Sequence, residues 1–240
     1  MKTVSRWFTD NLILLQLAIR LQLGRKFWFV PLLALSWPLF HALRLLVSNA
    51  AQSFNETAAQ NMLIGFPLTV IAIGLGVSII AGEIEQRTLE VAYTVPAGAR
   101  RIWMAKMAAI ILLLAVTEGL LAIITATFFT AFPLTSLYGA FQGAVFYLVL
   151  AMGLGALFKS EITAVLVTLV LLAANGVLSG FGDAPSRLSP LFNPLAVRNT
   201  SVSEILAWTV QNRIGVALAI AALTVLAFAR AEHREKLLGS

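Results

Sequence analysis

The chain has 240 residues, of which 59% are hydrophobic and 12% are charged, with a mean hydropathy of +0.88. Soluble domains carry about 25% charged residues, so this composition argues against a water-soluble fold. The chain has no cysteine, which excludes structural disulfides and thiolate metal sites. The formal net charge is +6. Because the basic residues stand at the ends of apolar runs, they indicate membrane topology and not a nucleic-acid partner.

The first predicted element is an amphipathic helix over residues 5–24. Its polar residues, Arg6 and Arg20 among them, share one narrow helical stripe, while Trp7, Phe8 and several leucines cover the remainder. Such a helix suits the membrane interface, with its aromatic rings at the level of the lipid headgroups. A seventh, poorly apolar membrane helix is the alternative.

A helix that crosses a bilayer needs about 20 mostly apolar residues, because unpaired backbone groups are costly in hydrocarbon. Six segments meet this condition. They are residues 27–47, 62–82, 107–131, 138–157, 162–182 and 210–229. The sequence therefore predicts an all-α integral membrane protein whose residues 1–240 form a single transmembrane domain.

Six crossings place both termini on one side of the membrane, and the Lys/Arg bias identifies that side as the cytoplasm. The basic residues on the side of the termini outnumber those on the other side. The inner set is Lys2, Arg6, Arg20, Arg25, Lys26, Arg87, Arg100, Arg101, Lys106, Lys159, Arg230, Arg234 and Lys236, and the outer set is Arg44, Arg187, Arg198 and Arg213. We therefore expect both termini to be cytoplasmic in a plasma membrane.

The connection over residues 83–106, between the second and third spans, is the most informative part of the chain. Thr88 is placed to cap a short helix with Glu90 in its first turn, and Pro96 with Gly98 predicts a turn before a second amphipathic stretch. Charged ends on a short helix along the membrane suit the docking of a soluble partner. A solvated connector without a partner is the alternative reading.

These residues resemble the permeases of the type-two ATP-binding-cassette (ABC) exporter family, whose corresponding loop reads approximately G-E-x-E-x-G-T-L-E, then Pro, then Arg and Lys. Two positions depart from that pattern, since Arg87 and Ala105 stand where the family commonly has Gly. The matching residues are Gly82, Glu83, Glu85, Thr88, Leu89, Glu90, Pro96, Arg101 and Lys106.

The resemblance implies the type V exporter fold, in which a cytoplasmic coupling helix between spans 2 and 3 docks on a separate nucleotide-binding ATPase subunit. It also implies a second permease subunit, in a homodimer or a heterodimer. ATP and Mg would be bound by the partner ATPase, and the sequence itself lacks the G-x-x-x-x-G-K-[ST] phosphate loop. The implied ATPase-coupling residues are Glu83, Glu85, Arg87, Thr88, Leu89, Glu90, Pro96, Arg100 and Arg101.

Glu118 is predicted to lie about 16 Å into the third span, near the midplane of the bilayer. A carboxyl group there is costly unless it faces the protein interior or pairs with a polar group. His41 and Arg44 are the candidate partners on the first span, and Asn175 is a lesser candidate. Glu118 either lines a substrate route or forms an interhelical hydrogen bond that fixes packing.

The outer segment over residues 183–208 combines Pro185, Pro190 and Pro194 with apolar residues such as Phe192. Its apolar content favours a re-entrant segment that dips back into the outer leaflet, and the family resemblance suggests the same. An ordered outer loop is the alternative.

The same residues bear on functions of other classes. An enzyme is not expected, because H-E-x-x-H is absent and the two histidines, His41 and His233, are far apart in the sequence. An ion-driven secondary transporter would be expected to show several midplane acids, whereas Glu118 stands nearly alone. The sequence favours an ABC exporter permease that also contacts membrane lipid. A force-transmitting membrane subunit without its own substrate route remains a second reading, and the substrate stays open.

Overall fold

A computed structural model describes residues 28–48, 54–86, 98–180, 187–198 and 200–232. Over these ranges the regular structure is entirely helical, with no strand, and six helical stretches are long and apolar enough to cross a membrane. This confirms the predicted all-α class and the predicted number of helices able to span a membrane over the described ranges. The predicted interfacial helix over residues 5–24 lies outside the described residues.

The second span is built from several consecutive helical pieces, one of which is a π-helix, whereas the other spans are single α-helices. The second span comprises α3 (Glu56–Ala58), η2 (Ala59–Gly65), α4 (Phe66–Val77) and α5 (Ala81–Glu85). The other spans are α2 (Phe29–Ser48), α7 (Gly98–Phe128), α8 (Leu134–Phe158), α9 (Glu161–Gly180) and α10 (Val202–Glu232), and a 3₁₀ turn, η3 (Pro194–Ala196), precedes α10.

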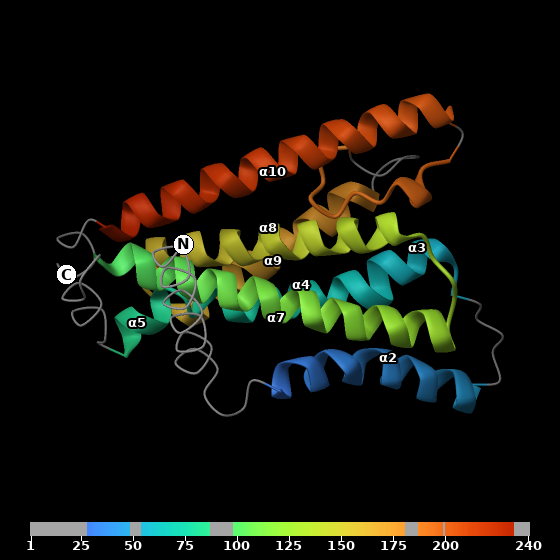
Figure 1. The fold of residues 1–240 in the computed structure, drawn as a ribbon, viewed down its shortest axis with the longest axis horizontal. Coiled ribbons are helices and arrows are strands. Elements are labelled where there is room, and N and C mark those ends of the chain that lie inside the picture. The colour runs from blue at the N-terminus through green and yellow to red at the C-terminus, as the bar shows by residue number, and fades with distance from the viewer. Residues whose placement is uncertain (1–27, 49–53, 87–97, 181–186, 199, 233–240) are drawn as a thin grey trace, which may run out of the picture.

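Helix α8 lies at the centre of the bundle, packed against α4, α9 and α10, while α2 packs against α7 (Figure 1). We call the end at which α5, the start of α7 and the end of α10 meet the junction end. We call the opposite end, which holds α3 and η3, the cavity end, because residues of both elements line a cavity there.

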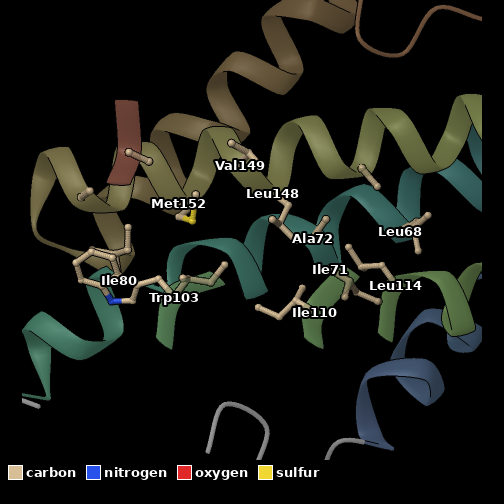
Figure 2. Close-up of a cluster of buried hydrophobic side chains, with 14 of the residues drawn as sticks. Leu68, Ile71, Ala72, Ile80, Trp103, Ile110, Leu114, Leu148, Val149 and Met152 are labelled. Atoms are coloured by element: carbon tan, nitrogen blue, oxygen red, sulfur yellow. The ribbon is translucent and has the colours of Figure 1, made fainter. Parts of the chain in front are cut away.

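The core forms where α4, α7 and α8 meet (Figure 2). Leu148 of α8 lies beside Ala72 of α4, and Ile110 of α7 completes the packing. Gly76 allows the close approach of α4 to α8, because a Cβ at this position would collide with the backbone of Leu148. The small residue thus lets two helices pack at backbone distance, as in other membrane helix pairs.

Large apolar side chains are exposed along much of α2, α9 and α10. Leu46 of α2 is 79% exposed, Leu178 of α9 is 70% exposed and Leu218 of α10 is 65% exposed. Soluble monomers rarely expose contiguous apolar surfaces of this extent. A bilayer would cover these side chains, which agrees with the membrane class.

Four predicted spans are longer in the structure than the hydropathy pattern suggested, and one of them is α8, which extends the predicted range 138–157 at both ends. Residues 98–106 belong to α7 and not to a separate loop, so the predicted start at residue 107 is wrong. Likewise α10 begins at Val202, inside the predicted re-entrant range 183–208. The helical second span starts at Glu56 instead of residue 62. Hydropathy marks only the apolar part of a helix, whereas the helix itself continues through polar residues into the interface.

Candidate functional site

Glu83 is the centre of a buried polar cluster at the junction end. Its carboxylate accepts hydrogen bonds from the Nζ of Lys106 at 2.6 Å and from the Nε1 of Trp103 at 2.8 Å. Trp103 and Lys106 are three residues apart in the sequence, so they share one face of α7. The Glu83 and Lys106 side chains are only 9% and 11% exposed. The end of the second span is therefore fixed to the start of the third.

Trp103 carries this connection on to α10. Its fully buried ring stacks on Phe228, with ring centroids 6.1 Å apart and an interplanar angle of 25°. An exposed ion pair at 3.9 Å between Arg100 and Glu232 joins the same two helices, although such surface pairs contribute little to stability. The buried aromatic stack thus joins α7 to α10 at this end.

Glu85 connects α5 to the hairpin between α8 and α9. Its Oε1 accepts a hydrogen bond of 2.8 Å from the backbone N–H of Glu161, the first residue of α9. A carboxylate there satisfies one of the free N–H groups of a helix start and faces the positive end of its dipole. Lys159, with φ of 58°, closes the preceding turn in the left-handed conformation. The side chain of Glu161 lies against Gly82, where a Cβ would come within 2.5 Å of its Oε1.

We call this set the helix junction: Glu83, Glu85, Trp103, Lys106, Glu161 and Phe228. Of the predicted coupling residues, Glu83 and Glu85 lie within it and bond to other parts of the same chain. Arg100 and Arg101 are exposed on the first turn of α7. The remaining predicted coupling residues, Arg87, Thr88, Leu89, Glu90 and Pro96, lie outside the described residues.

The polar residues predicted at membrane depth do not gather around Glu118. Glu118 is 8% exposed, and its Oε1 has no hydrogen-bond partner among the described residues. His41 is buried on α2 against the rings of Trp37 and Phe54, at centroid distances of 5.1 and 5.6 Å. Arg44 is exposed. In the described ranges, no hydrogen bond or ion pair joins Glu118 to His41 or Arg44.

Asn175 lies at the cavity end, where it donates a hydrogen bond of 3.0 Å to the Oγ of Ser189. Ser189 belongs to the outer segment, whose described part covers residues 187–198. That segment packs into the bundle, since the side chain of Leu191 lies where a Cβ on Gly143 of α8 would point. Asn175 therefore connects α9 to the outer segment and is separate from any arrangement around Glu118.

Sequence reasoning missed Trp103, Phe228 and Glu161 as members of the helix junction. The available signal was a pair of residues able to donate to an acid, Trp103 and Lys106, spaced three apart at the start of a span. Such a pair predicts a shared acceptor, and the acidic residues that end the preceding span were the nearest candidates.

The part of the chain that the structure describes holds no group of His, Cys, Asp or Glu able to bind a metal ion. No family model matches this chain, and neither a curated protein nor a solved structure matches it.

Proposed function

We propose that this chain is the membrane permease subunit of an ATP-driven exporter whose ATP hydrolysis takes place in a separate ATPase subunit. The observation that carries the proposal is the buried pair between Glu83 and Lys106, which fixes the connection between spans 2 and 3 to the bundle. The sequence motif around Glu83 indicates that the soluble partner is a nucleotide-binding ATPase. A second permease subunit would complete the exporter.

The helix junction offers a path by which a push on this connection reaches several spans together. Glu83 bonds to α7, the Trp103 ring passes the contact to α10, and Glu85 holds the start of α9. Opening a buried ion pair is costly, so α5 and α7 would move as one unit. A partner that displaces α5 would therefore shift α7, α9 and α10 in concert.

The distribution of basic residues supports a cytoplasmic junction end. Arg100, Arg101 and Lys159 lie at that end of the described helices, and the positive-inside rule places such residues in the cytoplasm. ATP and its hydrolysing subunit are available on that side. The proposed location is a plasma membrane with both termini inside.

Affinity purification of the full-length tagged chain from its native host tests the proposal. We expect an ATPase with a phosphate-loop motif to copurify in stoichiometric amounts. The reason is that the connection between spans 2 and 3, which carries the motif around Glu83, is the proposed docking element for that ATPase. Glu90→Arg should greatly reduce the recovered ATPase through charge reversal. Glu204→Arg, at an exposed acid near the start of α10 on the cavity end, is the matched control and should leave recovery unchanged.

Recovery of the chain without any ATPase would contradict the proposal. If the ATPase copurifies but ATP turnover moves no solute in reconstituted vesicles, the force-transmitting role replaces that of an exporter. If an ion gradient alone drives transport by the purified chain, the chain is a secondary transporter.

A further inference from the structure

A cavity of about 630 Å³ lies at the cavity end, between the second span, α8, α9 and the outer segment. Its volume falls within the range of ligand pockets in proteins, about 300–1,000 Å³. It is distinct from the helix junction, since none of the junction residues lines it.

The lining of this cavity combines a larger apolar surface with uncharged polar groups, and among the described residues it is almost free of charge. Asparagine, glutamine, serine and threonine residues from three parts of the chain, namely the second span, α9 and the outer segment, line it together with Phe66 and Phe192. Arg198 is the one charged residue among the described residues that line it, and no carboxylate does so. A cationic ligand or a metal ion would therefore find no opposite charge here.

Three lining residues carry a buried side-chain oxygen without a hydrogen-bond partner among the described residues. They are the Oε1 of Gln60, the Oγ1 of Thr69 and the Oγ of Ser179. Gln60 is 3% exposed and Thr69 is 1% exposed. Buried polar groups in folded proteins nearly always have a partner, so each exception indicates a missing one.

The hydrogen-bonding chemistry of these atoms limits the classes of ligand that suit the cavity. The Gln60 Oε1 is an acceptor and needs a donor, whereas the two hydroxyl groups can also donate. A carboxylate or a phosphodiester offers acceptors only and would leave the Gln60 oxygen unpaired. A hydroxyl group supplies both functions, and the exposed ring of Phe66 can contact the C–H face of a sugar ring.

The cavity walls are held in place by hydrogen bonds within the chain. Asn193 of the outer segment donates to the Oδ1 of Asn61 at 3.0 Å and to the backbone oxygen of Thr57 at 3.4 Å. The π-helical turn that carries Gln60 is a rare element that is frequent at functional sites. A pocket fixed in this manner loses little entropy when a ligand binds.

We infer that this cavity binds a neutral, hydroxyl-rich group: a sugar or polyol, either free or as the headgroup of a glycolipid. Gln60 accepts from one ligand hydroxyl, while Thr69 and Ser179 bond to others. The inference does not depend on the proposed function, since binding requires no ATPase.

The test measures equilibrium binding of radiolabelled glucose, radiolabelled maltose and glucosyl diacylglycerol to the full chain. The chain is held in phosphatidylcholine nanodiscs, because detergents with sugar headgroups would compete. Saturable binding of a free sugar identifies a soluble ligand, and binding of the glycolipid alone identifies a headgroup. Either result supports the inference. Absence of binding by all three probes, with the cavity filled by water only, overturns it, as does saturable binding of inorganic phosphate in their place.

Two variants distinguish a ligand site from a structural cluster. Thr69→Val and Ser179→Ala remove unpartnered oxygens, so each should weaken binding about tenfold and leave the melting temperature equal or higher. The control is Thr168→Val, because Thr168 is buried on α9 outside the cavity lining and bonds to the backbone oxygen of Ala164 at 2.6 Å. It should lower the melting temperature and leave binding unchanged. Lower melting temperatures with intact binding in the two cavity variants would overturn the inference.

Gly139→Ala provides an independent check. A Cβ there would lie 2.7 Å from the Nε2 of Gln60 and 2.6 Å from a guanidinium nitrogen of Arg213, so the Gln60 amide must move. Gly176→Ala adds the same methyl group at another lining residue, where no described atom lies within 4 Å. We expect Gly139→Ala to weaken binding about tenfold and Gly176→Ala to change it less. Equal effects of the two variants would contradict the placement of Gln60 in the site.

Discussion

Lys106 and Glu83 form an ion pair in which both side chains are nearly buried. Burial makes the pair costly to break from one side, since the remaining charge is left in a poorly solvated place. The pair is thus better understood as a fixed connection between helices than as a large net source of stability.

A double-mutant cycle tests this connection. Lys106→Met should lower the free energy of unfolding by about 3–5 kcal/mol, because the Glu83 carboxylate would stay in its buried place without the Lys106 ammonium. Adding Glu83→Gln removes the charge while it keeps an acceptor for Trp103, so part of the loss should be recovered. Thermal unfolding in nanodiscs measures both. Strictly additive effects of the two substitutions would show that the pair is not coupled.

Glu118 provides a second test, because its position offers two roles. The Glu118 Oε1 has no hydrogen-bond partner among the described residues, whereas the carboxyl group interacts with the backbone of Phe141 on α8. If Glu118 lines a substrate route, Glu118→Gln and Glu118→Ala should retain assembly and fold while transport in vesicles falls. Normal transport in both variants would remove Glu118 from the route, and a large loss of stability in Glu118→Gln would assign it to packing.

Among the helices, the contact between α4 and α8 depends on backbone proximity. Gly76→Ala should destabilise the bundle by about 1–3 kcal/mol, because the new Cβ would meet the backbone of Leu148, which cannot move aside easily. Gly74→Ala is the matched control on the same helix, since no described atom lies within 4 Å of its added Cβ. Unfolding temperatures of the two variants decide the point, and equal values would contradict the close approach.

The π-helix η2 is stabilised from the first span. The Nε1 of Trp37 donates a hydrogen bond of 2.9 Å to the backbone oxygen of Met62, and its ring packs on Phe66 at 4.9 Å. Trp37→Phe keeps an aromatic ring but removes the donor, so it should cost about 1 kcal/mol. Trp28→Phe, on an exposed ring before α2, should cost less. A larger effect of Trp28→Phe would argue against this anchoring of η2.

The spans were predictable from sequence because each contains enough apolar residues to cross a bilayer. The ends of the spans were harder to predict. Helix α7, for example, includes Arg100, Arg101 and Lys106, which lie beyond the apolar stretch that hydropathy detects. The π-helix could not be predicted, because its hydrogen-bond shift leaves no periodic signal over so few residues.

The candidate site, like the spans, could be predicted only in part from the sequence. The motif around Glu83 indicated an important connection between spans 2 and 3. It did not indicate that Glu83 bonds to Lys106 and Trp103, because contacts between helices depend on their final packing. The cavity at the cavity end could not be predicted either, because its lining residues come from segments far apart in the sequence.

The orientation of the whole protein can be measured with single cysteines, because the chain has none of its own. Leu188, 89% exposed on the outer segment, and Gln86, exposed beside α5, are suitable sites at opposite ends. A membrane-impermeant maleimide should label Leu188→Cys in intact cells and label Gln86→Cys only after lysis. The reverse pattern would place the helix junction outside the cell and contradict the proposed function.

The direct contact between this chain and an ATPase is the central claim, and site-specific photo-crosslinking measures it. A photoreactive residue at position 90, in the predicted docking element, should crosslink in cells to a protein with a phosphate-loop motif. The same residue at position 188, on the outer segment, should not. Crosslinking to that ATPase from position 188 but not from position 90, or from neither position, would contradict the account.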